Sequence, residues 1–255
     1  MGRDIAFWVL FVCSVIPPLT FGVLSDSHLL KAEGGISIII SEYLSIVLIP
    51  IFFILEIVCD RFYIAAEYTR RKGFIDNSFG SKLTGIDSVG YFSNDIQTPN
   101  FYKAAVNAFE SCHFTYHISS EMLKRMRVKN GLFCIVFLCV AYLGADRNTF
   151  VAPTLQSLIA AYFLKTLINA YFFKSRVGEI LEDFKVFFNG LIHKEFGAAD
   201  VPVSLKLIMD YETNLAYGTF KSDSAIFQIL NPSLSQAWDN MKTYYGIEKK
   251  ELPQY

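Results

Sequence analysis

Charged residues are scarce in this 255-residue chain, at 18% of the sequence. Soluble domains carry about 25% charged and about 45–50% apolar residues, whereas 53% of this chain is apolar. That deficit argues against an ordinary soluble domain. The five cysteines show no spacing typical of a secreted disulfide framework, so we expect free thiols in a reducing compartment.

Motifs of catalytic chemistry are also lacking. The sequence contains no Walker A loop, no Rossmann glycine fingerprint and no nucleophile elbow. His113 and His117 have the i, i+4 spacing of a helical metal pair, but no third ligand or general-base Glu accompanies them as a zincin would require. We therefore expect no catalytic residues, no metal and no cofactor.

The apolar residues gather in four runs. They cover residues 5–24, 36–59, 131–145 and 150–173. About 20 apolar residues in a helix cross a hydrocarbon core of roughly 30 Å. We expect an all-α integral membrane protein with four transmembrane helices. The alternative is a soluble domain in which the last two runs form a buried hairpin. The first run is longer than the h-region of a signal peptide and is interpreted as an anchor.

The basic residues predict the topology. Ten Lys and Arg residues lie between the second and third runs, nine follow the fourth, and Arg3 precedes the first. The two short connections carry only Lys31 and Arg147. Because positive residues near membrane ends stay inside, both termini and the long middle segment are expected in the cytoplasm of a bacterial cell, with the spans in its inner membrane.

Helical composition continues beyond the spans. We expect the second span to extend as one helix to near Gly73, a second long helix to run from Tyr102 into the third span, and the fourth to continue to about Asn189. Short helices follow Pro202, and Asn231-Pro232 predicts a helix start. The chain is thus divided into transmembrane segments at 1–59 and 131–173 and cytoplasmic helical segments at 60–130 and 174–255.

Two basic clusters are candidates for ligand binding. They are Arg70, Arg71 and Lys72 at a helix end, and Lys124, Arg125 and Arg127 before the third span. Such side chains contact phosphate, and aromatic residues nearby can stack on bases. The alternative is that both clusters face anionic lipid or obey the positive-inside bias.

Polar residues inside the spans are candidates for a pore lining. Lys165 lies within the fourth run, and Tyr162 and Asn169 share its helical face; Glu42 is a candidate in the second run. An ionisable residue in a membrane usually faces a partner or water. The alternatives for Lys165 are snorkelling and a static pair with Glu56.

Several segments together resemble one family. They are Phe74-Ile-Asp-Asn-Ser-Phe-Gly80, Gly90-Tyr-Phe-Ser-Asn94, Ala108-Phe-Glu-Ser-Cys-His-Phe-Thr-Tyr-His117, Tyr211-Glu-Thr-Asn-Leu-Ala-Tyr217, and Ile226-Phe-Gln-Ile-Leu-Asn-Pro-Ser-Leu-Ser-Gln-Ala-Trp238 with Tyr245-Gly-Ile247. With the order of the spans, they resemble the SMODS-associated four-transmembrane effector family, the Hailong-type membrane effectors of bacterial anti-phage defence.

The resemblance implies a toxic, homo-oligomeric membrane channel, for which a tetramer is our working assumption. It also implies control by a nucleotide or oligonucleotide second messenger from a partner nucleotidyltransferase, with depolarisation and growth arrest as the outcome. Two other functions remain open. One is a small membrane enzyme acting on lipids through His113, His117 and Glu110, and the other is a non-conducting membrane anchor.

Overall fold

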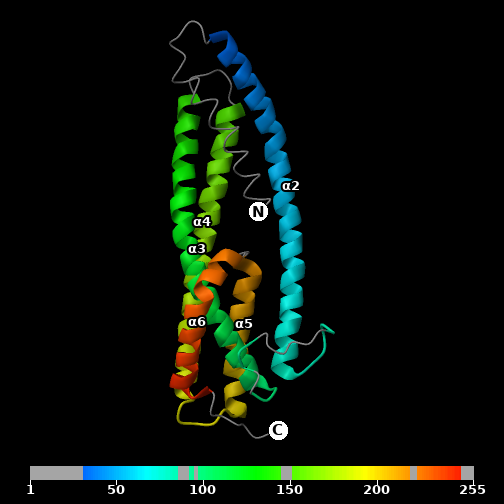
Figure 1. Cartoon of the computed structure of the whole chain (residues 1–255), viewed down its shortest axis with the longest axis vertical. Coiled ribbons are helices and arrows are strands. Elements are labelled where there is room, and N and C mark those ends of the chain that lie inside the picture. Colours follow the sequence, from blue (N-terminus) through cyan, green and yellow to red (C-terminus); the bar gives the residue numbers. More distant parts are fainter. Residues whose placement is uncertain (1–30, 86–91, 95–96, 145–150, 219–222, 248–255) are drawn as a thin grey trace. The chain divides into compact units, whose positions relative to one another are not determined.

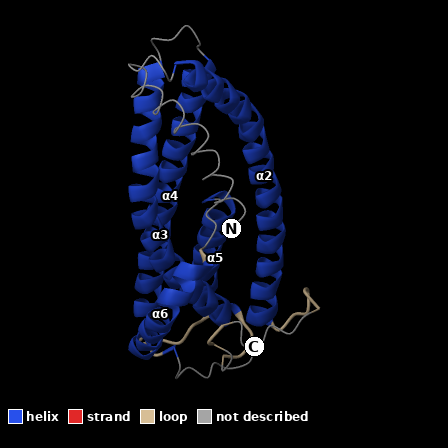
Figure 2. Cartoon of the chain, turned by 45° about the horizontal axis from the view of Figure 1, so that its top comes forward, coloured by secondary structure: helices blue, strands red, loops and turns tan. Residues whose placement is uncertain are grey.

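The computed structural model describes residues 31–85, 92–94, 97–144, 151–218 and 223–247, and leaves out most side chains of 31–52 and 136–160. In these ranges the chain is all-α and forms five helices, coloured along the sequence in Figure 1 and as helix in Figure 2. The helices are α2 (Lys31–Phe79), α3 (Phe101–Gly144), α4 (Val151–Gly190), α5 (Val201–Gly218) and α6 (Ser224–Tyr245), with a 3-10 turn, η1 (Ala198–Asp200), before α5. The all-α prediction is confirmed.

The chain divides into two compact units. Unit 1 comprises residues 1–64 and 126–167, and unit 2 comprises 65–125 and 168–255. Helices α2, α3 and α4 each contribute residues to both units, whereas α5 and α6 belong to unit 2.

Helix α2 continues past the end expected near Gly73 and stops at Phe79, so that prediction is wrong. Gly73 has open space around it, whereas Gly80 adopts φ +68°, which terminates a helix without the strain a Cβ would bring. The carboxylate of Asp76 then fixes the exit by accepting hydrogen bonds from the backbone N–H groups of Leu83 and Thr84 at 2.7 and 2.8 Å.

The start of α6 also differs from the prediction at Asn231-Pro232. Asp223 caps the helix, because its carboxylate accepts from the backbone N–H groups of Ala225 and Ile226, and Pro232 lies inside α6. The cap two turns earlier therefore sets the boundary. The long helices predicted from Tyr102 onward and as far as about Asn189 are confirmed by α3 and α4.

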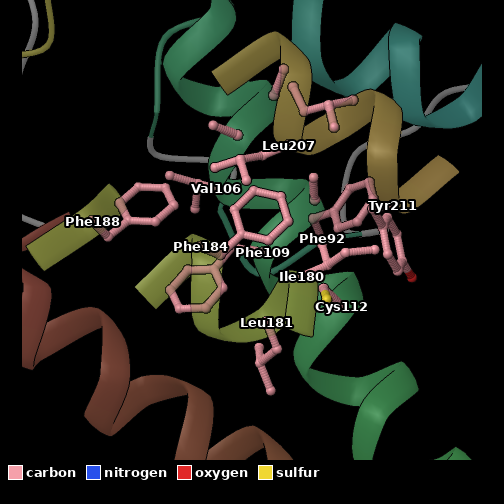
Figure 3. Close-up of a cluster of buried hydrophobic side chains, with 14 of the residues drawn as sticks. Phe92, Val106, Phe109, Cys112, Ile180, Leu181, Phe184, Phe188, Leu207 and Tyr211 are labelled. Atoms are coloured by element: carbon pink, nitrogen blue, oxygen red, sulfur yellow. The ribbon is translucent and has the colours of Figure 1, made fainter. Parts of the chain in front are cut away.

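The core of unit 2 is aromatic and centres on Phe109 of α3 (Figure 3). Its ring stacks on Phe184 and Phe188 of α4, with centroids 5.6 and 5.0 Å away, and meets the edges of Trp238 and Tyr245 of α6. These four contacts join three helices through one side chain. Leu207 and Tyr211 bring α5 into the same cluster (Figure 3).

Unit 1 presents apolar side chains outward. Among its described residues, the large apolar side chains that are at least half exposed include Val47, Ile54, Ile57, Phe62, Ile64, Val128, Leu132, Ile135, Leu138 and Leu164. They come from α2, α3 and α4 alike. Much of the apolar surface in the described part of unit 1 is therefore not covered by the other described residues.

No helix, within the residues that the structure describes, combines the length and the apolar character needed to cross a membrane. This differs from the four spans expected from the sequence. The first of those spans, at 5–24, lies outside the described residues, as do most side chains of 36–52 and 136–160.

Glycine at 218 allows a close contact between α5 and α4. A Cβ on Gly218 would overlap the buried ring of Phe173 at Cδ2 and lie 2.7 Å from its Cε2. We expect Gly218→Ala to lower the free energy of unfolding by about 1–3 kcal/mol, because an added methyl group forces a packed neighbour to shift. Thermal unfolding of the purified chain measures the change. In the control Gly190→Ala the added Cβ meets nothing within 4 Å, and equal effects of the two substitutions would contradict the packing explanation.

Candidate functional site

The first basic cluster ties α2 to α5 through one carboxylate. Arg70 Nη2 lies 2.6 Å from Glu212 Oε2, and Arg71 Nε lies 3.2 Å from the same oxygen. Arg70 Nε also donates to Glu67 Oε2 at 2.8 Å. The side chains of Arg70 and Glu212 are each 19% exposed, and that of Arg71 is 38% exposed. The structure thus places two of the three predicted phosphate ligands together. We call Arg70, Arg71 and Glu212 the arginine clamp.

Sequence reasoning missed the acidic member of the clamp. Glu212 lies far along the chain from Arg70, and only the packing of α5 against α2 brings it near. Its one signal in the sequence is its place in the Tyr211–Tyr217 segment, which is part of the family resemblance. A long-range ion pair of this kind has no periodic signature in a single sequence.

Electrostatics keep the clamp charged. Burial lowers the pKa of the Arg70 guanidinium, but the charge and hydrogen bond of Glu212, with smaller contributions from Tyr211 and Glu67, outweigh burial and raise this pKa above its ordinary value. Arg70 is therefore a permanent cation. A cation held at a half-buried position binds an oxyanion more strongly than one in bulk water.

The third residue of the first cluster has a different contact. Lys72 Nζ lies 4.4 Å from the centroid of the Tyr68 ring, one helical turn earlier, in a cation–π arrangement. Lys72 therefore contacts its own helix, whereas Arg70 and Arg71 contact α5.

The second cluster is more exposed. Lys124 and Arg125 both pair with Glu121, at 3.2 and 3.6 Å, one turn earlier on α3. The Lys124 and Arg125 side chains are 72% and 53% exposed, and exposed pairs at this spacing contribute little to stability. Arg127 is exposed and belongs to unit 1. The structure thus groups Lys124 with Arg125 on a helix surface and builds no half-buried site around them from the described residues.

The candidate pore-lining residues have separate environments. Tyr162 donates a hydrogen bond of 2.6 Å to Glu56 Oε1 and packs edge-on against Phe53, so α2 and α4 meet here in unit 1. Lys165 and Asn169 are exposed side chains of α4. Glu42 lies in the helical backbone of α2, but its side chain is outside the described residues.

The alternative catalytic set lies inside unit 2. His113 and His117 pack with ring centroids 4.7 Å apart. Glu110 accepts hydrogen bonds from Asn94 at 2.6 Å and Ser93 at 3.1 Å, and burial raises its pKa. The described residues contain no cluster of three or more metal-ligating side chains. His113 is buried, His117 is exposed, and both oxygens of Glu110 accept hydrogen bonds.

A buried polar network was also missed. Asn107 on α3 donates to Asn77 Oδ1 at 2.9 Å and to Ser78 Oγ at 3.1 Å, and accepts from Asn94 at 3.0 Å. Trp238 Nε1 donates to Ser93 Oγ at 3.0 Å. These bonds fix the end of α2, the segment at 92–94 and α6 onto α3. Hydrogen bonds between buried side chains favour one packing arrangement.

Comparisons of the chain with protein-family models, with curated proteins and with solved structures find no match. The site is therefore characterised by its own geometry. Among the candidates from the sequence, the arginine clamp has the chemistry of an oxyanion site, because it holds two guanidinium groups on a single acceptor.

Proposed function

We propose that this chain is a membrane effector of bacterial anti-phage defence, in which unit 1 forms part of a homo-oligomeric pore in the inner membrane and unit 2 binds a controlling nucleotide or oligonucleotide. A partner nucleotidyltransferase supplies the messenger. Opening of the pore depolarises the membrane and arrests growth. The finer fold belongs to this proposal: four membrane helices, with cytoplasmic segments at 60–130 and 174–255.

The observation that carries the proposal is the exposed apolar surface of unit 1. The described part of unit 1 exposes large apolar side chains on all three of its helices, over the stretches that the sequence marks as apolar runs. Unit 2 also exposes some, such as Phe172 and Tyr217, but it has a buried aromatic core around Phe109. Exposed apolar surface of this extent marks contact with lipid or with another protein surface. The four apolar runs of the sequence favour lipid for the outer face and a second copy for the remainder.

The arginine clamp supports the ligand-binding role of unit 2. Nucleotide phosphates are recognised by guanidinium groups that present paired N–H donors. Arg70 and Arg71 present such donors from adjacent positions on α2, the same helix that supplies residues 31–64 of unit 1. A ligand at the clamp therefore acts on a helix that is shared with the proposed pore.

Induced expression in bacteria tests the proposal. We expect the full-length chain to resist extraction from membranes by carbonate, and a potential-sensitive dye to report depolarisation that depends on the presence or absence of the partner nucleotidyltransferase. Reporters fused after Tyr255 and inserted next to Ser93 should be active only in the cytoplasm. Recovery of the chain in the soluble fraction, or an unchanged potential in both backgrounds, would refute it.

Lys165 provides a test of the pore itself. If this lysine lines the conducting path, its charge attracts anions and repels cations. Lys165→Gln should then lower the anion-to-cation permeability ratio about thirtyfold, because about 1 kcal/mol of attraction and about 1 kcal/mol of repulsion between charges 4 Å apart in water both enter the ratio. Reversal potentials of the reconstituted chain in asymmetric salt measure this ratio. Lys206→Gln, at an exposed pair with Asp210 on α5, is the control. An unchanged reversal potential in an assembled variant would remove Lys165 from the pore.

A further inference from the structure

We propose that Glu212 is an internal competitor for the phosphate-binding site, and that a phosphate group binds by taking its place on Arg70 and Arg71. The inference rests on the proposed function for the identity of the ligand, a phosphate-bearing nucleotide. It adds how the site is regulated: the site is closed by the chain's own carboxylate, and ligand binding is an exchange.

The geometry of the clamp is that of a shared acceptor. Both guanidinium groups bond the same oxygen, Oε2 of Glu212, at 2.6 and 3.2 Å. One carboxylate thus supplies a single negative charge, largely through one atom, to two cations. A terminal phosphate carries up to two charges and three acceptor oxygens, so each guanidinium can pair with its own oxygens. The exchange therefore favours a ligand with more charge than the carboxylate it displaces.

The clamp is accessible to a solute. The Arg71 side chain is 38% exposed, and Glu212 and Arg70 are each 19% exposed. Partial burial strengthens the ion pairs relative to a surface bridge, while the exposed fraction leaves a route for an anion. Arg70 keeps its bond to Glu67 at 2.8 Å when Glu212 leaves, so it stays oriented on α2.

The exchange has a mechanical consequence. The ion pairs of Glu212 join α5 to α2, and they are lost when a phosphate, which belongs to neither helix, takes the place of this carboxylate. The weaker bond of 3.5 Å from Arg71 Nη2 to the Glu212 backbone carbonyl is then the remaining contact of the clamp between the two helices. A ligand shifts a conformational equilibrium only by its different affinity for the two states. A state with Glu212 released exposes both guanidinium groups, and it is this state that phosphate favours. Loosening of α5 from α2 is thus the signal that binding produces.

Removal of the competing charge tests the exchange. The purified full-length chain in detergent is titrated with radiolabelled ATP as a soluble phosphate probe, and with phosphatidylglycerol in mixed micelles as a lipid phosphate probe. We expect Glu212→Gln to bind ATP about tenfold more tightly than the wild type, since a charged competitor becomes a neutral one, and tenfold corresponds to ~1.4 kcal/mol. Glu179→Gln, which neutralises an exposed pair with Arg176 on α4, should leave the affinity unchanged.

Each outcome shows whether phosphate displaces Glu212 from the two arginines. A gain in Glu212→Gln that disappears when Arg70 and Arg71 are also replaced by Gln supports the exchange. Unchanged or weaker binding in Glu212→Gln overturns it, and so does a gain that survives loss of both arginines. A gain for phosphatidylglycerol alone keeps the exchange but contradicts the nucleotide as ligand, so the proposed function then fails separately from the inference.

Hydrogen exchange on the wild-type chain keeps the inference testable if Glu212→Gln does not fold. Saturating ATP should slow exchange of α2 amides around residues 67–72. It should speed exchange of α5 amides around 209–216, because α5 loses the ion pairs of Glu212 with Arg70 and Arg71. Protection of both segments would overturn the exchange, since it would mean that the phosphate binds with Glu212 in place.

Discussion

Replacement of Phe109 by alanine is expected to lower the free energy of unfolding of unit 2 by about 3–5 kcal/mol, the range for a fully buried phenylalanine whose cavity does not collapse. Phe109 has no exposed surface and its ring contacts four other aromatic rings. The cavity would be bordered by α3, α4 and α6 together, so no single helix can move to fill it. A domain is stable by only about 5–15 kcal/mol, so the loss is a large fraction of the total.

Thermal unfolding of the full-length chain, followed by circular dichroism, measures this effect. Tyr217→Ala is the control, because Tyr217 is 84% exposed on α5, and a surface truncation changes stability by about 0.5 kcal/mol or less. A loss at Phe109 no larger than the loss at Tyr217 would show that the aromatic cluster does not support the fold.

Acidification from pH 6.5 to about 4 is expected to destabilise unit 2 through His113. Burial, with smaller contributions from the neighbouring His117 and Lys185, lowers the pKa of this imidazole from 6.5 to about 4, although a hydrogen bond to the backbone of Leu234 opposes them in part. His113 therefore binds its proton at a lower pH in the folded chain than in the unfolded chain. Stability from His113 is complete above pH 6.5 and is lost as the pH falls toward 4, by about 3 kcal/mol in total.

His113→Phe isolates this contribution. The variant should lose most of the difference in stability between pH 6.5 and 4, measured by denaturant unfolding at both values, because phenylalanine has no proton to bind. His117 acts in the same direction, and Glu110, whose pKa is raised by burial, acts in the opposite one. The difference between variant and wild type therefore reports His113 alone. His193→Gln, at an exposed position, should keep the wild-type profile, and an unchanged profile in His113→Phe would contradict the assignment.

Helix boundaries show where local sequence signals fail. The helix expected to end near Gly73 continues, because the left-handed residue is Gly80. Beyond it, the carboxylate of Asp76 accepts hydrogen bonds from the backbone amides of Leu83 and Thr84. The start expected at Asn231-Pro232 is overridden by the cap at Asp223. Gly73 and Pro232 were each a plausible helix boundary by residue type. The observed boundaries lie instead near Asp76 and Asp223, whose carboxylates accept hydrogen bonds from backbone amides.

The candidate site shows a different limit. The sequence singled out Arg70 and Arg71 as adjacent basic residues, and phosphate binding by them stays a prediction; the structure places them inside α2 and not at its end. Their partner Glu212 could not be predicted, because it comes from α5 and its approach depends on how two helices pack. The same holds for the network through Asn107, whose partners come from α2 and from the segment at 92–94.

The sequence by itself determined the helical class and the long continuous helices, because apolar runs and good helix formers are local features that can be read directly from the sequence. It also determined which residues carry charge. Only the tertiary structure decided what those charges face, since the energy of a charge depends on its burial and on partners brought from distant segments. From the sequence alone, Arg70 would be expected to be a solvated cation. In the fold it is one of the two arginines paired with Glu212, because α5 places that carboxylate beside it.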